Sequence, residues 1–159
     1  MKPQQTTLIH LSLLLAVLFS MMPFPETIRL FMPYWTGLVI IYWSLNRPDK
    51  NLILYAFAYG LLLDILNGSL LGKHGFSMVA ITFLVSKFNT QLRMTSIWQL
   101  DLIVVVLLLN DLLIRSLIDW LAYQHTPEFN ALLPLLSALI LWPWLKYLLD
   151  RVIIGMRSN

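Results

Sequence analysis

Apolar residues occur in long runs along the chain, and prolines, glycines and single charged residues separate these runs. A helix needs about 20 predominantly apolar residues to cross the hydrocarbon core of a bilayer. The pattern therefore predicts six membrane-spanning helices with short connections. Their ranges are Leu8–Phe24, Leu30–Leu45, Leu52–Leu66, Phe76–Phe88 (about 70–88 with the turn before it), Ile97–Leu121 and Ala131–Leu149.

Composition agrees with a membrane protein. Of the 159 residues, 58% are apolar and 12% are charged, and the mean hydropathy is +0.74, which is outside the usual range of water-soluble domains. Six spans fill the chain, so we expect an all-α, polytopic bundle that forms one integral membrane domain over residues 1–159. The first run is expected to stay as a span, because no small-residue cleavage pattern follows it.

Lysine and arginine are unevenly distributed over the predicted loops. Short loops that are rich in these residues stay in the cytoplasm. With the N-terminus inside, only Arg29 and Lys73 are external, and Arg115 lies within the fifth run. The predicted cytoplasmic residues are Lys2, Arg47, Lys50, Lys87, Arg93, Lys146, Arg151 and Arg157. This asymmetry predicts that both termini are cytoplasmic.

Several function classes are disfavoured. The basic residues are scattered singly, without the blocks that bind nucleic acid. The chain has no cysteine, which excludes thiolate metal sites and cysteine nucleophiles. No nucleophile–base pair, phosphate-binding loop or pair of catalytic carboxylates occurs at a meaningful spacing. We therefore expect a protein that is not an enzyme and has no catalytic residue, cofactor or metal.

One carboxylate, Asp64, lies in an apolar run that ends in a group of glycines. Gly60, Gly68 and Gly72 let the backbone turn tightly or approach another helix closely, and an ionisable residue in a span normally faces the bundle and finds a partner. Three roles are open to Asp64. It caps its own turn, contacts a partner helix or lipid headgroup, or takes part in ion or proton translocation.

His74 follows this turn directly. The chain has two other histidines, His10 and His125, and neither lies at metal-ligand spacing from it. We expect a solvated histidine at the membrane interface, not a metal ligand or a proton relay.

The fifth run has the highest density of polar residues. Steps of four place Asp111, Arg115 and Asp119 on one helical face, where Arg115 can pair with either carboxylate. A rise of about 1.5 Å per residue puts Asp111 about 15 Å beyond Asp101, and therefore inside the bilayer. Two interpretations follow: an internally neutralised pair inside the bundle, or a polar seam that contacts another membrane protein.

Aromatic residues and prolines lead to two further expectations. Tryptophans and tyrosines near the predicted interfaces indicate an aromatic belt. These residues are Tyr34, Trp35, Tyr42, Trp43, Trp98, Trp120, Tyr123, Trp142, Trp144 and Tyr147. Pro33 and Pro143 are expected to kink their helices.

Five motifs together resemble a known family. In chain order they are Met22-Pro23-Phe24-Pro25, Phe31-Met32-Pro33-Tyr34-Trp35, Tyr42-Trp43 with Pro48, the stretch from Gly60 to Gly72, and Leu141-Trp142-Pro143-Trp144. This order resembles the MreD family of rod-shape-determining proteins, of the gammaproteobacterial type found in Gram-negative bacteria. The resemblance runs nearly end to end and is most specific at the glycine–aspartate hairpin. The resemblance weakens in the fifth run. The importance of Asp111 and Arg115 is therefore inferred from their spacing alone.

The resemblance implies a non-enzymatic inner-membrane component of the cell-elongation machinery. Such a protein would work with MreC, the actin-like MreB filament, the RodA glycosyltransferase and its partner penicillin-binding transpeptidase. A small bundle with almost no loops offers mainly contacts to other spans and to membrane lipids. Gly60, Asp64, Gly68, Gly72, Asp111 and Arg115 are therefore the candidate structural or partner-contact residues.

The alternative function is transport. The MreD fold looks distantly similar to the substrate-binding subunits of energy-coupling-factor vitamin transporters, and the short, glycine-interrupted third and fourth runs suit a pocket near the outer surface. Short external loops with few polar groups argue against it. Neighbouring genes for MreB and MreC would favour the scaffold, whereas an ATPase pair would favour transport.

Overall fold

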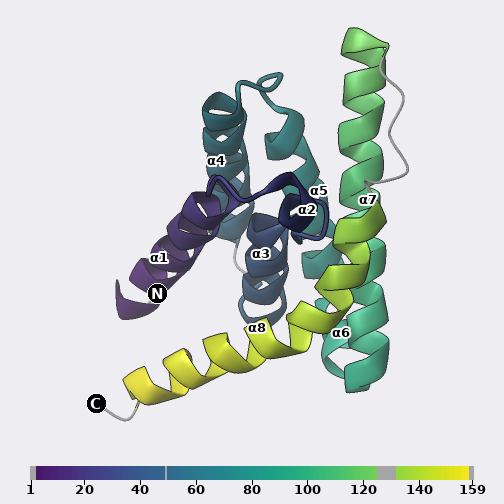
Figure 1. Cartoon of the computed structure of the whole chain (residues 1–159). Coiled ribbons are helices and arrows are strands. Elements are labelled where there is room, and N and C mark those ends of the chain that lie inside the picture. The colour runs from purple at the N-terminus through teal and green to yellow at the C-terminus, as the bar shows by residue number, and fades with distance from the viewer. Residues whose placement is uncertain (1–2, 49, 125–131, 158–159) are drawn as a thin grey trace.

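The computed structural model describes residues 3–48, 50–124 and 132–157, and the regular elements in these ranges are all helices (Figure 1). They are α1 (Pro3–Ser20), α2 (Glu26–Arg29), α3 (Trp35–Asn46), α4 (Lys50–Asn67), α5 (Lys73–Lys87), α6 (Asn89–Arg93), α7 (Ile97–Tyr123) and α8 (Leu133–Arg157). The predicted all-α fold is confirmed.

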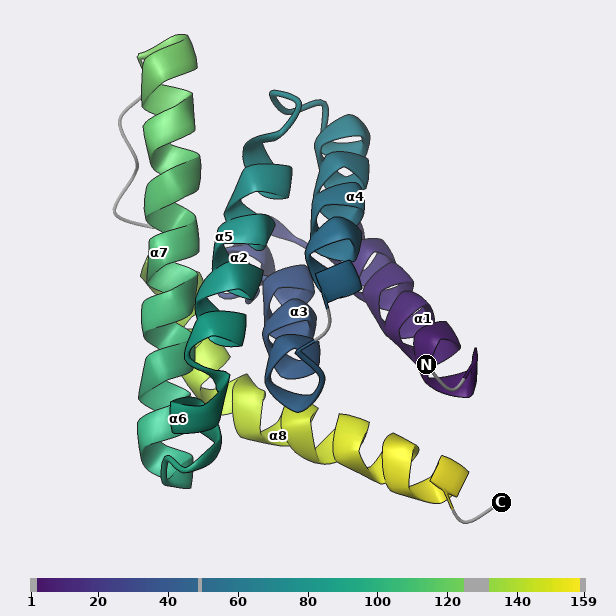
Figure 2. The same cartoon turned by 180° about the vertical axis from the view of Figure 1, so that it is seen from behind.

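Helix α3 lies at the centre of the bundle. Its residues from Thr36 to Leu45 are all buried, and it contacts α1, α5, α7 and α8. A helix that is apolar all round needs apolar neighbours on every side, and the other helices supply them. Figures 1 and 2 show α1 and α4 on one side of α3, α7 on the other, and α8 crossing near its C-terminal end.

Helices α4 and α5 form an antiparallel hairpin, and α7 packs against both α5 and α8. The α4–α5 turn and the C-terminal end of α7 lie at the same end of the molecule, at the top of Figure 1. The N-terminal end of α7 and the short helix α6 lie at the opposite end. This arrangement brings the polar residues of α7 beside the start of α5.

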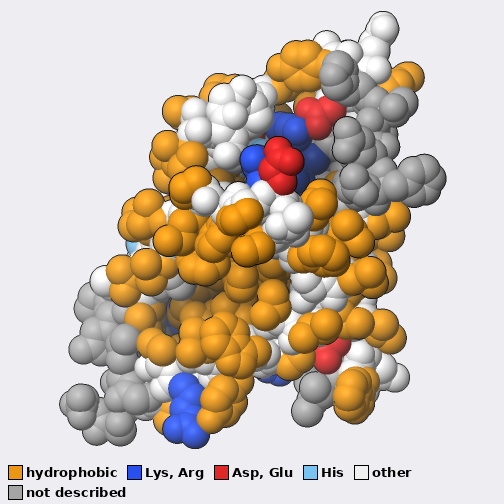
Figure 3. All heavy atoms as spheres, in the orientation of Figure 1, with side chains coloured by type: hydrophobic (Ala, Val, Ile, Leu, Met, Phe, Trp, Pro, Cys, Tyr) orange, Lys and Arg blue, Asp and Glu red, His pale blue; other side chains and the backbone are white. Residues whose placement is uncertain are grey.

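Large apolar side chains are exposed along the outer helices. Leu15 and Leu18 of α1 are each 56% exposed, and Ile140 of α8 is 77% exposed. In Figure 3 the middle of the visible face is mostly hydrophobic, whereas charged side chains gather near the upper end and a few lie at the lower end. Soluble monomers rarely expose contiguous apolar surface of this extent, which instead marks a surface for lipid or for a protein partner.

One helical stretch in the described ranges, Leu133–Ile154, is long and apolar enough to cross a membrane by length and composition, and Thr6–Ser20 and Asn51–Asn67 are shorter apolar helices. Helix α7 is longer than any of these, but several charged residues interrupt it. The crossing of the membrane by six spans therefore stays a prediction.

The first two predicted ranges differ from the helices observed. Helix α1 ends at Ser20, not at Phe24, and α3 begins at Trp35, not at Leu30. Prolines in the connection lack an N–H donor and disfavour helical geometry in the preceding residue. Pro33 lies before α3, not within it, so the expected kink at Pro33 is wrong.

The last helix is longer than predicted. Helix α8 continues to Arg157, beyond the predicted end at Leu149. Pro143 does lie inside α8, and the helix bends along its length in Figures 1 and 2. Lys2, the predicted start at Ala131 and most of the loop before it, including His125, lie outside the described residues.

Two tryptophans of the predicted interfacial belt lie in the core instead. Trp43 and Trp142 are 2% and 1% exposed, and the indole of Trp43 donates a hydrogen bond to Ser12 Oγ at 2.8 Å. Their assignment to the membrane interface is therefore wrong. Trp98, Trp120 and Trp144 are exposed, as interfacial residues would be.

Candidate functional site

The connection between α4 and α5 is a tight turn built on two glycines. Gly68 and Gly72 have φ angles of +62° and +97°, a region that glycine adopts without steric cost. The N–H of Ser69 donates to the carbonyl of Asp64 at 3.0 Å, which closes the end of α4. A Cβ on Gly68 would meet nothing within 4 Å, whereas one on Gly72 would lie 3.0 Å from the Phe76 ring. Gly68 is therefore required for conformation, and Gly72 for both conformation and space.

The carboxylate of Asp64 organises this turn. It is fully buried and accepts hydrogen bonds from Ser69 Oγ at 2.8 Å, from the N–H of Gly72 at 2.8 Å and from the N–H of His74 at 3.1 Å. The two N–H groups belong to the start of α5, where the first turn of a helix leaves its donors without partners. The hydrogen bonds expected of a carboxylate that caps its own turn are therefore present.

His74 departs from the sequence prediction. The residue is 9% exposed, not solvated, and its Nδ1 lies 2.7 Å from Asp64 Oδ1. Its ring also lies beside that of Tyr34, with the ring centroids 5.9 Å apart. The expectation of a solvated histidine is wrong, because the turn brings His74 back over the end of α4.

Gly60 holds α4 and α5 close together. A Cβ added to Gly60 would lie 2.4 Å from the Cα of Gly75, a separation that no real side chain tolerates. A Cβ on Gly75 would in turn lie 3.2 Å from the Phe57 ring. Small residues let helix backbones approach in this way in membrane proteins. Gly60 therefore sets the spacing of the hairpin one turn below Asp64.

Asp111 and Arg115 form a buried ion pair on α7. Asp111 is fully buried and accepts hydrogen bonds from Nε of Arg115 at 2.8 Å, from Nη2 of the same guanidinium and from the hydroxyl of Ser77 on α5. The guanidinium carbon lies 4.7 Å from the centroid of the Tyr34 ring, a cation–π contact. The spacing of four residues allowed Arg115 to pair with either Asp111 or Asp119, and the structure selects Asp111.

Asp119 takes a different partner. Lys73 Nζ, at the start of α5, lies 2.5 Å from Asp119 Oδ2. The two side chains are 17% and 31% exposed, so water partly screens this pair. Asp111 and Asp119 of α7, each in an ion pair, therefore face the α4–α5 hairpin, and Asp64 lies at the turn of this hairpin.

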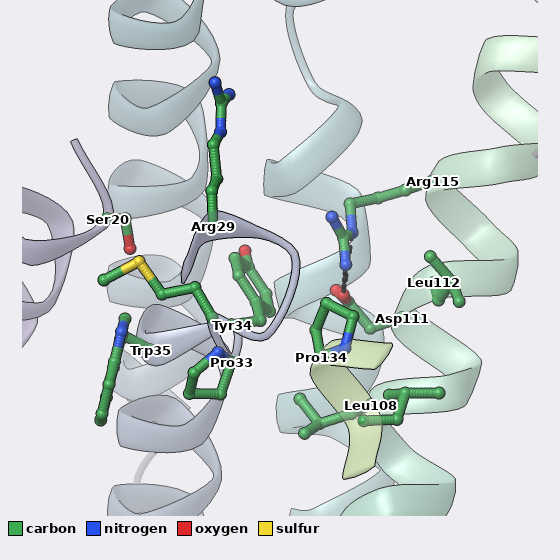
Figure 4. Close-up of a pocket in the computed structure, with 12 residues that line it drawn as sticks. Ser20, Arg29, Pro33, Tyr34, Trp35, Leu108, Asp111, Leu112, Arg115 and Pro134 are labelled. Atoms are coloured by element: carbon green, nitrogen blue, oxygen red, sulfur yellow. Dashed lines mark hydrogen bonds and ion pairs between the residues drawn. The ribbon is translucent and has the colours of Figure 1, made fainter. Parts of the chain in front are cut away.

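A pocket of about 290 Å³ lies beside the Asp111–Arg115 pair. Its lining residues are Ser20, Arg29, Met32, Pro33, Tyr34, Trp35, Leu108, Asp111, Leu112, Arg115, Pro134 and Leu135. Figure 4 shows the Arg115 guanidinium meeting Asp111, with the Tyr34 ring next to this pair. Arg29 extends outward from the connection before α3. Within the described ranges, no group of three or more His, Cys, Asp or Glu side chains is placed to hold a metal ion.

Sequence reasoning missed three residues of this site. Ser77 is a hydroxyl in an apolar run, Tyr34 follows a proline, and His74 follows the glycine turn. The signal for Ser77 was weak, because serine in a span commonly bonds to its own helix. Tyr34 was assigned to the interfacial belt, but it lies between His74 and Arg115.

Comparison with known proteins gives two matches. The family model described as "rod shape-determining protein MreD" matches residues 1–152. A curated relative, "Rod shape-determining protein MreD" of Haemophilus influenzae, is 28% identical over 138 residues, which cover 87% of this chain and 85% of the relative. No solved structure matches the chain.

Proposed function

The chain belongs to the MreD family of rod shape-determining proteins, and on this basis we propose that it is a non-enzymatic scaffold of the cell-elongation complex in the bacterial inner membrane. In this role it controls cell shape and lateral peptidoglycan synthesis. MreC is the principal proposed partner, with MreB, RodA and its penicillin-binding transpeptidase in the same assembly. The family match over residues 1–152 favours this role over transport.

One observation carries the scaffold proposal: the two fully buried carboxylates, Asp64 and Asp111, are engaged within the chain. Asp64 is bonded to its own turn, and Asp111 is bonded to Arg115 and Ser77. A carboxylate that is saturated in this way is poorly placed for acid–base or nucleophilic chemistry. Exposed apolar helix faces remain, and they suit contacts with other membrane helices.

The proposed topology has six spans, α1, α3, α4, α5, α7 and α8, with both termini in the cytoplasm. In Figures 1 and 2, α3, α4, α5 and α7 alternate in direction, α1 runs obliquely beside them, and α8 descends and then turns across the end of the bundle. Lys73 lies at the end of the molecule assigned to the outside, whereas Arg93 lies on α6 at the other end. The uneven charge of the loops supports the same orientation.

Reporter fusions test this topology. A reporter that is active only in the periplasm should be active when inserted between Ser69 and Lys73, or within the segment 126–130, which lies outside the described residues. It should be inactive after Asn159. The readout is reporter activity normalised to the amount of fusion protein. A periplasmic C-terminus would contradict the six-span arrangement.

Co-purification tests the scaffold role. Tagged protein extracted in mild detergent should retain MreC, and its gene should restore rod shape to cells that lack MreD. The matched variants change single outward-facing residues, Leu11→Ala on α1 and Ile140→Ala on α8, because these exposed side chains contribute little to the core. Loss of MreC in one variant that is folded normally would locate the contact. If wild-type protein restored shape without retaining MreC, the direct contact would be wrong.

A further inference from the structure

The pocket beside Arg115 contains two buried hydrogen-bonding atoms that have no partner in the described part of the chain. They are the hydroxyl oxygen of Tyr34 and the indole nitrogen of Trp35, and both residues line the pocket. An indole N–H is only a donor, and buried polar atoms normally have a partner. These two atoms therefore favour a ligand that carries hydrogen-bond acceptors.

The charge around the pocket favours an anion. Asp111 neutralises Arg115, which leaves Arg29, at the rim of the pocket, as an additional positive charge. The pocket also lies at the beginning of α3, where no side chain caps the helix. The N-terminus of a helix attracts negative charge because its first N–H groups point outward. A ligand with one negative charge on oxygen atoms would match this arrangement.

A second cavity, about 260 Å³ in volume, adjoins the first at Trp35. It is lined almost entirely by apolar side chains of α1, α3 and α8, among them Phe19, Val39 and Leu148. Trp35 lines both cavities. The apolar cavity extends along α1 as far as Ser12. This apolar lining favours an acyl chain over a polar group.

We propose that the two cavities form one binding site for an anionic phospholipid. The phosphodiester accepts hydrogen bonds from Tyr34 and Trp35 near Arg29, and one acyl chain lies in the groove between α1 and α8. A phosphodiester has one negative charge and two free oxygens, and a headgroup without a cation avoids the repulsion that choline would meet from Arg29. The proposal rests on the membrane topology given above, in which this end of α3 faces outward, and it places the lipid in the outer leaflet of the inner membrane.

Binding to defined lipids tests the proposal. Full-length protein in detergent is titrated with dioleoyl phosphatidylglycerol, and with dioleoyl phosphatidylcholine, dihexanoyl phosphatidylglycerol and inorganic phosphate as comparisons. Thermal unfolding and native mass spectrometry are the readouts. Long-chain phosphatidylglycerol should raise the melting temperature in a saturable way and bind at one copy per chain. If phosphate alone or the short-chain lipid stabilised the protein equally well, the apolar groove would not be part of the binding site.

Three variants locate the lipid. Tyr34→Phe removes the hydroxyl and keeps the ring, and Trp35→Phe removes the indole N–H and leaves a smaller aromatic side chain. Each should weaken binding about tenfold, the usual effect of one hydrogen bond to a charged acceptor. Arg29→Gln should reduce the preference for phosphatidylglycerol over phosphatidylcholine. Trp98→Phe is the matched control, because Trp98 is 82% exposed and lies outside both cavities, and it should bind like the wild type.

Two outcomes would overturn the proposal. One is phosphatidylcholine binding as tightly as phosphatidylglycerol. The other is wild-type lipid binding by Trp35→Phe and Tyr34→Phe. If these variants lost MreC instead, the pocket would bind a protein segment. The scaffold role would survive failure of the lipid proposal, because MreC co-purification and restored cell shape are measured separately.

Discussion

Replacing Arg115 or Asp111 alone with leucine should destabilise the protein strongly, whereas replacing both together should restore much of the loss. Each single change leaves one charge of a buried pair without its partner, which costs about 3–5 kcal/mol. The stranded group differs between the variants. A lone carboxylate can take up a proton, but an arginine remains charged.

The double variant removes both charges at once. Ser77 then loses the acceptor that Asp111 provides, but a serine in a helix can bond to a carbonyl of its own preceding turn. The Arg115 contact with the Tyr34 ring is lost in both the single Arg115 change and the double change. We therefore expect the double variant to lie between the wild type and either single variant.

Thermal unfolding in detergent is the measurement, and restoration of rod shape is scored in parallel. The matched control is the Lys73–Asp119 pair, whose side chains are 17% and 31% exposed. Breaking a partly exposed pair usually changes stability by about 0–1 kcal/mol. A double variant as unstable as the worse single one would show that mutual pairing is wrong. Restored stability without restored rod shape would indicate that the pair also contacts another protein.

Asp64→Leu should unfold the α4–α5 turn, and Asp64→Asn should have a milder effect. Leucine leaves the N–H groups of Gly72 and His74 without an acceptor, and each unsatisfied buried group costs about 1–3 kcal/mol. Asparagine keeps one acceptor oxygen but presents an NH₂ group in place of the other. It therefore preserves some of these bonds and loses the remainder.

Unfolding in detergent and shape complementation measure this series. Ser69→Ala is the control, because it removes one side-chain donor to Asp64 and leaves the two backbone donors in place. This variant should lose about 1 kcal/mol or less of unfolding free energy. Wild-type stability of Asp64→Leu would contradict the role assigned to the carboxylate. Normal stability of Asp64→Asn with loss of rod shape would indicate a partner contact at the turn.

Local spacing explains the features that sequence analysis predicted correctly. Asp111 and Arg115 are four residues apart on one helix, so their pairing depends only on helix geometry. Asp64 lies just before a glycine turn. The two N–H groups that donate hydrogen bonds to it follow within ten residues. Each of the six apolar runs likewise overlaps one of the six longer helices in the described ranges, although most helix ends differ from the predicted ones.

Contacts between helices were decided by the tertiary structure. The burial of His74, the approach of Gly60 to Gly75, and the hydrogen bond from Ser77 to Asp111 each depend on how two helices are rotated and offset. Trp43 and Trp142 are buried for the same reason. In a chain that is apolar on almost every face, hydrophobic periodicity does not distinguish sides that meet protein from sides that meet lipid. Only side-chain packing makes that distinction, and it placed Tyr34 and Trp35 at the pocket.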